Sequence, residues 1–495
     1  MTILAKLDSH AARTPDAPAL DGVGYAQLRT ASLRVATQLR RAGIAPGDRI
    51  VLYAENSHAF VYAYLGGLRA GAVVVPANVL YRESDLAGVI DDSGAIAIAV
   101  SRQSRPFAAA GTSIMLLDLE DVAAWAADAS LDPGEFRLPN EERLALLIYT
   151  SGTTGRAKGA MLTHGNLAAI AEQVTTAWHW TSRDTLLLAL PLFHIHGLGA
   201  GLNGTIFAGA RLLLRERFDA LEVARALRAG EATMFFGVPT MYVRLLESDS
   251  TEGFDRVRLF VSGSAALPAS VHDAFAQRFG ASILERYGST EFGFALTNRY
   301  AGARYAGTVG FPFPGVDVEL LRADGKAVAL GDVGEIAVSG PNVSTGYWRN
   351  EAATDAAFFI DERGRRWYRS GDLGSYDSER GYSIVGRIKE LIITGGFNVY
   401  PLEVEDELLR LPGVRASAVI GKPDPARGEI PVAFVETENG TNPQLLIAAL
   451  QTRLASFKIP KEIYQIEALP RNAMGKVDKP QLRARLLAEG GARGR

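Results

Sequence analysis

Short apolar runs alternate with amphipathic stretches along most of the chain before Gly315. The runs are rich in aliphatic and β-branched residues and end in small or polar ones, as buried parallel strands do: DRIVLYAENS, AGAVVVPANV, AIAIAVS, LALLIYT and ATMFFGVPT. Between them lie stretches with helical spacing, among them FVYAYLGGLRAG, SDLAGVIDDSG and ALEVARALRAGE. This alternation predicts βαβ units and parallel sheets, and therefore an α/β fold.

The pattern changes twice in the later part of the chain. From about Gly315, runs such as VDVELLRADGKAV and GEIAVSGPNV follow closely on glycine and aspartate turns, which indicates an antiparallel or barrel-like unit. After GYSIVGRIKELIITGG a compact α+β pattern takes over. The length of 495 residues, 47% of them hydrophobic, exceeds one ordinary core. We place the boundary at 386–390 and predict two domains, 1–386 and 387–495.

Composition narrows the classes of function. The net charge of −3 comes from mixed signs without a basic block, which argues against nucleic acid as a partner. The amino end has no signal-peptide pattern and the apolar runs are too short for a membrane span, so we expect a soluble cytoplasmic enzyme. The absence of cysteine excludes disulfides, thiolate metal sites and a cysteine nucleophile. Any thioester sulfur must come from a substrate.

The loop YTSGTTGRAKG at 149–159 is the first candidate for chemistry. Glycine N–H groups, hydroxyls and a lysine can together hold a polyphosphate, which makes candidates of Ser151, Gly152, Thr153, Thr154, Gly155 and Lys158. The spacing is not that of a Walker loop, because glycine and alanine follow Lys158. By itself the loop is also compatible with a glycine-rich surface turn.

The segment RYGSTEFG at 286–293 is the second candidate. A carboxylate beside hydroxyls in a glycine-bounded turn can hold Mg²⁺, so Glu291 with Thr290 forms a possible nucleotide corner. Tyr287 could stack on a base. Taken alone, Tyr287 is equally a core aromatic residue and Glu291 a solvated turn residue.

Three further segments carry polar residues in turns. Asp372 in YRSGDLG could accept hydrogen bonds from ribose hydroxyls, or form an Asx turn. Gly395 and Gly396 in GRIKELIITGGFNVYPLEVE could admit a narrow ligand, or make a bulge. Lys476 in LPRNAMGKVDKPQLR could stabilise a transferred phosphoryl group, or be solvated.

The five segments together, in this order, resemble the acyl-CoA synthetases of the superfamily of adenylate-forming enzymes, over essentially the whole chain. The resemblance implies an α/β fold, with a large N-terminal domain of two αβ sheet subdomains and a distorted β-barrel. A small mobile α+β C-terminal domain would follow it. It also implies that Mg²⁺, ATP, coenzyme A and a small-molecule carboxylate are bound by a monomer or homodimer, which makes an acyl adenylate and then a thioester.

The resemblance assigns a role to each matching position. Thr150 to Lys158 would hold the β- and γ-phosphates, Thr290 the α-phosphate, and Glu291 with Thr154 the metal. The adenine would be framed by Ser264 and Ala265 of SGSAAL and by Glu285, Arg286, Tyr287 and Gly288. Asp372 and Arg387 would hold the ribose, and Lys476 would be the catalytic lysine of adenylation. Lys389 would be the hinge whose rotation replaces Lys476 by Gly395 and Gly396 beside the pantetheine arm.

The acid substrate is indicated by LPLFHIHGLG, FFGVPTMYVRLL and GFALTNRYAGARYAGTVG, which look most like malonyl-CoA synthetases. His196, Arg244 and Arg304 would receive the distal carboxylate, since a second buried carboxylate needs charged partners. Ser289 and Phe294 depart from the malonate pattern, and Phe294 would reshape the acyl pocket. Methylmalonate, a longer diacid, a short or medium-chain or aryl monocarboxylate, and a catalytically silent adenylate-binding protein stay open as alternatives.

Overall fold

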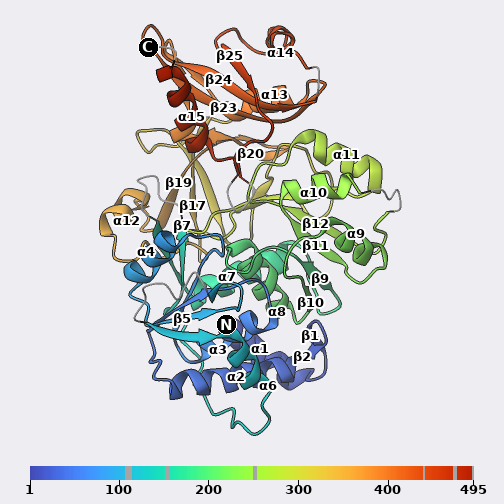
Figure 1. The fold of residues 1–495 in the computed structure, drawn as a ribbon, viewed down its shortest axis with the longest axis vertical. Coiled ribbons are helices and arrows are strands. Elements are labelled where there is room, and N and C mark those ends of the chain that lie inside the picture. The colour runs from blue at the N-terminus through green and yellow to red at the C-terminus, as the bar shows by residue number, and fades with distance from the viewer. Residues whose placement is uncertain (106–113, 151–156, 249–252, 439–440, 472–475, 493–495) are drawn as a thin grey trace.

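The computed structural model describes residues 1–105, 114–150, 157–248, 253–438, 441–471 and 476–492, the side chains of 487–492 excepted. It contains two sheets with parallel cores, an antiparallel sheet and a separate C-terminal sheet. In Figure 1 the C-terminal sheet lies at one end of the molecule and the N-terminal helices lie at the other. Among the described residues, no helix combines the length and apolar character that a membrane crossing requires.

The smaller parallel sheet follows the predicted alternation. Its strands are β3 (Arg49–Tyr53), β4 (Val73–Pro76), β5 (Ala97–Val100), β6 (Met115–Asp118), β7 (Leu144–Thr150) and β8 (Lys158–Thr163). They are ordered β6-β5-β3-β4-β7-β8, and only β7 and β8 pair antiparallel. Alternate residues of β3 enter different cores, with Ile50 and Leu52 on one face and Val51 and Tyr53 on the other.

The larger sheet has nine strands and also has a parallel centre. Its strands are β1 (Pro18–Leu20), β2 (Val23–Gly24), β9 (Thr185–Leu188), β10 (Arg211–Leu214), β11 (Met234–Gly237), β12 (Leu259–Ser262), β13 (Ile283–Tyr287), β14 (Leu296–Thr297) and β15 (Phe311–Pro312). The order is β15-β14-β13-β12-β11-β9-β10-β1-β2. Strands β3, β4, β5, β7 and β11 coincide with the five predicted runs, which confirms the α/β prediction.

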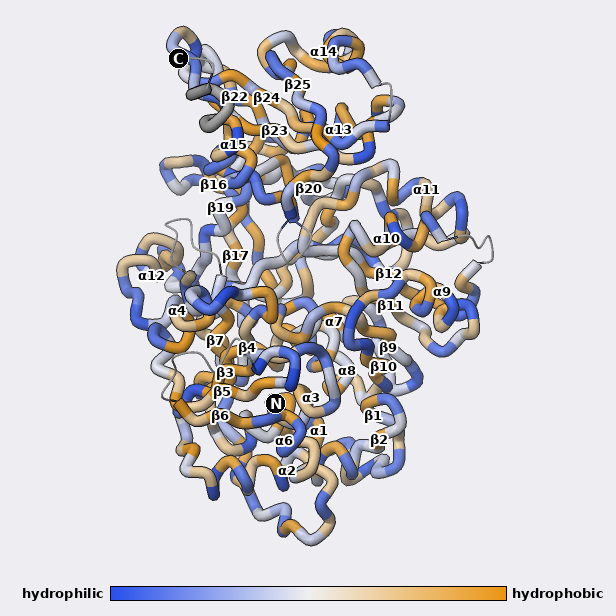
Figure 2. Tube along the Cα trace, viewed as in Figure 1, coloured by the Kyte–Doolittle hydropathy of each residue, from blue (hydrophilic) through white to orange (hydrophobic). Residues whose placement is uncertain are grey.

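Helices cover both parallel sheets. They are α1 (Ile3–Arg13), α2 (Tyr25–Arg41), α3 (His58–Arg69), α4 (Glu83–Ser93), α6 (Leu119–Ala127), α7 (His164–Ala177), α8 (Gly204–Ala208), α9 (Ala220–Arg228), α10 (Pro239–Leu246), α11 (Ala269–Phe279) and the π-helix η1 (His196–Asn203). The largest core joins both sheets through α2, α3 and α7. Figure 2 shows hydrophobic residues along strands such as β3 and β5, and hydrophilic residues towards the periphery.

The antiparallel sheet connects these layers to the C-terminal sheet. It contains β16 (Asp317–Leu321), β17 (Gly334–Ser339), β18 (Phe358–Ile360), β19 (Arg366–Asp377) and β20 (Gly381–Arg387), with α12 (Glu351–Ala357) beside it. The order is β16-β17-β19-β18, with β20 also on β19. Within the described part of the chain it has free edges, so the barrel-like unit of the prediction is an open sheet.

The C-terminal sheet has its own hydrophobic cores on both faces. Its elements are β21 (Ile392–Thr394), β22 (Phe397–Val399), β23 (Val414–Asp424), β24 (Gly428–Thr437), β25 (Glu462–Gln465), α13 (Pro401–Leu409), α14 (Pro443–Leu450) and α15 (Lys479–Ala492). A single 3₁₀ turn, η2 (Ile388–Glu390), connects β20 to β21. This is the α+β unit that the sequence indicates, while the boundary at residue 386 stays a prediction.

Candidate active site

The candidate site lies where strands of both parallel sheets end close to the antiparallel sheet (Figure 1). β12 ends at Ser262 and β13 at Tyr287, and because the two strands are parallel, the residues after them emerge at one sheet edge. Asp372 of β19 reaches this edge, where its Oδ2 accepts a 2.6 Å hydrogen bond from the Tyr287 hydroxyl. Residues far apart in sequence therefore meet at one position.

Most of the predicted phosphate loop lies outside the described residues, namely Ser151, Gly152, Thr153, Thr154 and Gly155. The residues that flank it are Thr150 and Lys158, which pair across β7 and β8. The Thr150 hydroxyl lies 3.5 Å from Glu291 Oε1, and Lys158 Nζ lies 5.4 Å from the centre of the Tyr347 ring. The strand pair therefore begins and ends the loop beside Glu291.

Hydroxyl groups surround Glu291 on both sides of its carboxylate. Ser289 Oγ donates to Oε2 at 2.8 Å and the Tyr347 hydroxyl donates to Oε1 at 2.9 Å. The Tyr368 hydroxyl lies 3.3 Å from that of Tyr347, and Thr290 is buried next to Glu291 in the chain. No group of three or more potential metal-ligating side chains occurs among the described residues. A single carboxylate fits Mg²⁺, which is bound through one or two carboxylates together with phosphate oxygens.

The predicted ribose residues form an ion pair. Arg387 Nε lies 2.8 Å from Asp372 Oδ1, and the two residues are directly opposite in β19 and β20. The Asp372 carboxylate raises the pKa of Arg387, and burial, followed by the same carboxylate, raises the pKa of Tyr287. Asp372 thus remains an oriented acceptor with lone pairs left for further donors.

Lys476 belongs to the C-terminal domain but interacts electrostatically with the site. Although the residue keeps solvent exposure, its surroundings lower the pKa of Lys476 to about 8, first by desolvation and then by repulsion from Arg387. Arg286 also lowers this pKa, whereas Asp372 and Glu291 raise it. The structure therefore brings the predicted lysine, glutamate and aspartate into one electrostatic environment.

The predicted adenine frame has a tightly constrained backbone. Ser264 has a φ of 71°, a left-handed conformation that non-glycine residues rarely adopt and that often occurs at functional sites. A Cβ atom at Gly288 would lie 2.0 Å from the carbonyl oxygen of Gly293, so only glycine fits there. Ala265 is exposed, and Glu285 is buried with a pKa raised to about 8 by desolvation.

His196 lies at the start of the π-helix η1, a helix type that frequently marks functional sites. The residue is completely buried, and its Nδ1 lies 3.4 Å from Ser264 Oγ, while no described residue bonds Nε2. Its backbone N–H donates to His194 Nδ1 at 3.2 Å. Burial, followed by Arg286 and His194, lowers the pKa of His196 well below its usual value, so the ring is neutral.

Arg286 lies near the same serine hydroxyl as His196. Its Nη2 is 3.3 Å from Ser264 Oγ and its guanidinium carbon is 4.5 Å from the centre of the Phe294 ring. The residue is 4% exposed, and no described carboxylate lies within ion-pair distance of it. Burial lowers the pKa of Arg286 to about 9. A Cβ at Gly263 would lie 2.4 Å from Arg286 Nε, so the glycine makes room for this side chain.

None of the described contacts of Arg244 or Arg304 reaches His196, so they give the predicted carboxylate-binding trio no support. Arg244 is exposed near the end of α10, with its guanidinium 5.3 Å from the centre of the Phe218 ring. The guanidinium of Arg304 donates to the backbone carbonyls of Arg299, Tyr300 and Ser282. Both arginines thus make local contacts in this structure, and the cation beside His196 is Arg286, which the resemblance places at the adenine.

The predicted hinge and pantetheine residues lie at the junction to the C-terminal sheet. Lys389 is in η2, where desolvation and repulsion from Lys158 and Arg387 lower its pKa. Gly395 and Gly396 have φ values of 57° and 84° in the turn between β21 and β22, and both are exposed. Their predicted roles stay predictions.

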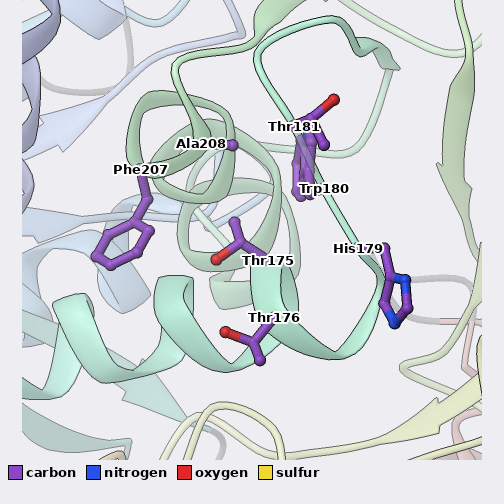
Figure 3. A pocket seen from close by; sticks show the side chains of 7 residues that line it. All are labelled: Thr175, Thr176, His179, Trp180, Thr181, Phe207 and Ala208. Carbon is purple, nitrogen blue, oxygen red and sulfur yellow. The ribbon is translucent and has the colours of Figure 1, made fainter.

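The sequence analysis missed His194, Tyr347 and Tyr368. His194 could have been found from the HIH segment, where only the second histidine was chosen. Tyr347 is 56 positions from Glu291 and carries no motif of its own that the analysis used. A surface hollow beside the end of α7 (Figure 3) is lined by Thr175, Thr176, His179, Trp180, Thr181, Phe207 and Ala208. It contains none of the predicted site residues.

Comparisons with known proteins find similar families, relatives and solved structures. Residues 7–348 match the family model of AMP-binding enzymes, and residues 403–476 match that of the AMP-binding enzyme C-terminal domain. The chain is 37% identical to a feruloyl-CoA synthase of Amycolatopsis sp, over 93% of each chain. It is 34% identical to the mitochondrial malonate–CoA ligase of Mus musculus, over 94% of this chain and 87% of the relative. ATP-bound MatB from Rhodopseudomonas palustris superposes with a TM-score of 0.91 at 36% identity, over 98% of this chain and 99% of that one.

Proposed function

The chain belongs to the family of AMP-binding enzymes and is an AMP-forming acyl-CoA ligase, and on this premise we propose that its acid is malonate or a similar small dicarboxylate, such as methylmalonate. The observation that carries the proposal is the buried guanidinium of Arg286 beside His196. Burying a cation without a carboxylate is costly, and a substrate carboxylate in this pocket would offset that cost. A planar guanidinium also binds carboxylates bidentately.

The side chains around His196 and Arg286 would suit a short diacid by both their polar and their apolar groups. His196 Nε2 and Arg286 Nε lack hydrogen-bond partners among the described residues, so both can bind a distal carboxylate. Phe294 and Phe236 border His196, with ring centres 6.1 and 6.2 Å from that of the imidazole. These rings limit the space beside the cation, which favours a short chain between the two carboxylates.

The reaction would proceed in two steps. One carboxylate of the acid attacks the α-phosphorus of ATP, the bond to the bridging oxygen breaks and pyrophosphate leaves. The thiol sulfur of coenzyme A then attacks the acyl carbon, its proton is lost and AMP leaves. Lys476, as an ammonium, would stabilise the negative charge that develops in the first step. Asp372, oriented by Arg387 and Tyr287, would accept hydrogen bonds from the ribose.

The predicted phosphate loop from Thr150 to Lys158 would bind the β- and γ-phosphates, and Thr290 the α-phosphate. Glu291 would hold Mg²⁺, which when bound neutralises phosphate oxygens and so permits the attack of one anion on another. Lys389, Gly395 and Gly396 keep the hinge and pantetheine roles that the resemblance implies. The described positions of Thr150, Lys158 and Glu291 around one point support this arrangement.

An aryl monocarboxylate is the second candidate. The similarity to a feruloyl-CoA synthase and the aromatic side chains around His196 favour it. An aromatic acid would place its ring against Phe294 and leave Arg286 without a carboxylate. The two candidates thus differ in whether the buried cation contributes to the choice of acid.

The test is a panel of malonate, methylmalonate, octanoate and ferulate, each assayed with ATP and coenzyme A for pyrophosphate release and thioester formation. We expect kcat/KM to be highest for malonate or methylmalonate. Arg286→Ala should lower kcat/KM for the diacid. The loss should correspond to about 2 to 4 kcal/mol of activation free energy, the scale for leaving a buried carboxylate unpaired.

Arg244→Ala is the matched control, because it removes an exposed arginine that packs on Phe218. This variant should retain the preference of the wild type. A wild type that prefers ferulate or octanoate would contradict the diacid proposal. A protein that binds ATP and forms neither product with any acid would contradict the ligase function itself.

A further inference from the structure

The described hydrogen bonds to the carboxylate of Glu291 all come from neutral groups, although the carboxylate also interacts electrostatically with Lys476. Its two oxygens accept hydrogen bonds from Ser289 and Tyr347, with Thr150 at 3.5 Å, and the residue is 7% exposed. Within the described residues no cation lies at ion-pair distance from it, although buried carboxylates normally pair with one. Lys158 is close, but its ammonium lies over the Tyr347 ring.

Tyr347 is itself fixed in place on several sides. Its backbone N–H donates to Thr354 Oγ1 at 3.0 Å, and the residue forms an isolated antiparallel bridge with Ala160 of β8. Its hydroxyl lies 3.3 Å from that of Tyr368, and its ring packs against Phe358. Tyr347 therefore connects the strand that begins at Lys158 to the carboxylate of Glu291.

We propose that Tyr347 and Ser289 are positioning residues that fix the Glu291 carboxylate for the divalent cation of the ATP complex. Hydroxyl donors orient a carboxylate without neutralising it, whereas an ion-paired lysine or arginine would compete with the metal. Each oxygen keeps lone pairs for a metal after accepting one hydrogen bond. Because the side chain is already ordered, little conformational entropy is lost when the cation binds.

Ser289 forms two hydrogen bonds with Glu291 that a purely space-filling residue could not form. The Ser289 hydroxyl donates a hydrogen bond to Glu291 Oε2. It also accepts a hydrogen bond from the Glu291 backbone N–H at 3.2 Å. An apolar side chain at this position could fill the space but could not orient the carboxylate. The proposal rests on the metal role of Glu291 and is independent of which acid the enzyme uses.

The experiment measures ATP affinity by isothermal titration calorimetry at a series of Mg²⁺ concentrations and in EDTA. For Tyr347→Phe and for Ser289→Ala we expect the Mg²⁺ concentration for half-maximal tightening of ATP binding to rise about tenfold, the lower end of the scale for one lost hydrogen bond to a charged group. ATP affinity in EDTA should be unchanged. In a Glu291→Gln background neither substitution should shift the Mg²⁺ dependence further.

Tyr382→Phe is the matched control. Tyr382 is buried to the same degree as Tyr347, but its hydroxyl donates to the backbone carbonyl of Val318, outside the site. This variant should keep the Mg²⁺ dependence of the wild type. Equal weakening of ATP binding with and without Mg²⁺ in Tyr347→Phe would overturn the proposal, as would an additive effect with Glu291→Gln. A Glu291→Gln variant with unchanged Mg²⁺ dependence would also overturn it, and would leave the acid panel and its conclusion intact.

Discussion

At Glu291 both carboxylate oxygens have hydroxyl donors, whereas at Arg286, five positions earlier, a buried guanidinium has a nitrogen that no described residue satisfies. His196 beside Arg286 shows the same deficiency at Nε2. Buried polar groups are nearly always hydrogen-bonded in native proteins, so unpaired ones require an explanation. We interpret the hydrogen-bonded Glu291 as a group whose geometry does not depend on the substrate. Arg286 and His196 are interpreted as groups whose missing hydrogen bonds a substrate would complete.

The difference has a physical consequence for specificity. A site built around unpaired polar groups discriminates strongly against ligands that cannot pair with them, because those groups then stay desolvated. Glu291 has hydrogen-bond donors without a ligand, so its geometry stays the same for every acid that the enzyme uses. We therefore expect substitutions of Arg286 or His196 to change which acid is preferred. Substitutions of Glu291 or Tyr347 should instead change the binding of the nucleotide.

The largest effect should come from Lys476, which interacts electrostatically with both regions. Lys476→Ala should lower the rate of adenylation about 10²- to 10³-fold, the scale for one charge-stabilising group, and should affect thioester formation from preformed acyl adenylate much less. Because the lowered pKa is about 8 and the charged form is needed, wild-type adenylation should decline as the pH rises through about 8. Single-turnover assays of each half-reaction measure this. Equal losses in both would contradict the assigned role.

The sequence predicts one of these regions better than the other. Glu291, Asp372 and Lys476 are predicted because each lies in a short polar motif, and Arg387 because the family resemblance implies it. The partner of Glu291 is a tyrosine 56 positions away, and a contact between two side chains leaves no periodic signal in either segment. The open antiparallel sheet was read as barrel-like for a related reason, since closure depends on pairing between distant edge strands.

Arg286 lies beside His196 in the structure, and the sequence contains a signal that separates it from its neighbours in the strand. Neighbouring residues in a strand face opposite sides, so Glu285, Arg286 and Tyr287 of β13 cannot all frame one adenine. The same alternation explains why adjacent Glu285 and Arg286 are not paired with each other. Arg244 and Arg304 are the charges that the resemblance to malonyl-CoA synthetases implies, and burial, which distinguishes Arg286 from them, cannot be read from residue type alone.

The stability of ligand-free variants sharpens the comparison, because the two regions should respond with opposite signs. Arg286→Met removes a desolvated charge and should leave the free energy of unfolding unchanged or raise it by about 1 kcal/mol. Tyr347→Phe leaves Glu291 with one donor fewer and should lower it by about 1 kcal/mol. Thermal midpoints measured without ligands, at one scan rate, test both directions.

Arg258→Met is the control for the arginine substitution. Arg258 is held by Asp184, with Nε 2.7 Å from Oδ1, so its removal leaves a buried carboxylate unpaired. We expect a loss of about 2 to 3 kcal/mol. If Arg286→Met destabilised the protein as much as Arg258→Met, Arg286 would be a structural residue and the distinction between the two regions would fail.

Glu285 combines features of both regions, because one of its carboxylate oxygens has a hydrogen-bond donor and the other has no described partner. Its Oε2 accepts from the Leu267 N–H at 3.4 Å, while Oε1 has no described partner, and burial raises its pKa to about 8. The folded protein therefore keeps this carboxyl protonated at neutral pH, whereas the unfolded chain loses the proton near the usual pKa of about 4.3. It follows that the stability contributed by Glu285 falls as the pH rises from about 4.3 to 8.

Glu285→Gln, which cannot ionise, should match the wild type near pH 5 and exceed its stability by about 1 kcal/mol or more at pH 8. Thermal midpoints between pH 5 and 8.5 measure this difference, with Glu335→Gln as the control, since it removes an ion pair with Arg369 and should show no such growth with pH. A constant difference across the range would mean that Glu285 is ionised in the folded protein, so that a buried carboxylate keeps its charge although one of its oxygens has no described partner.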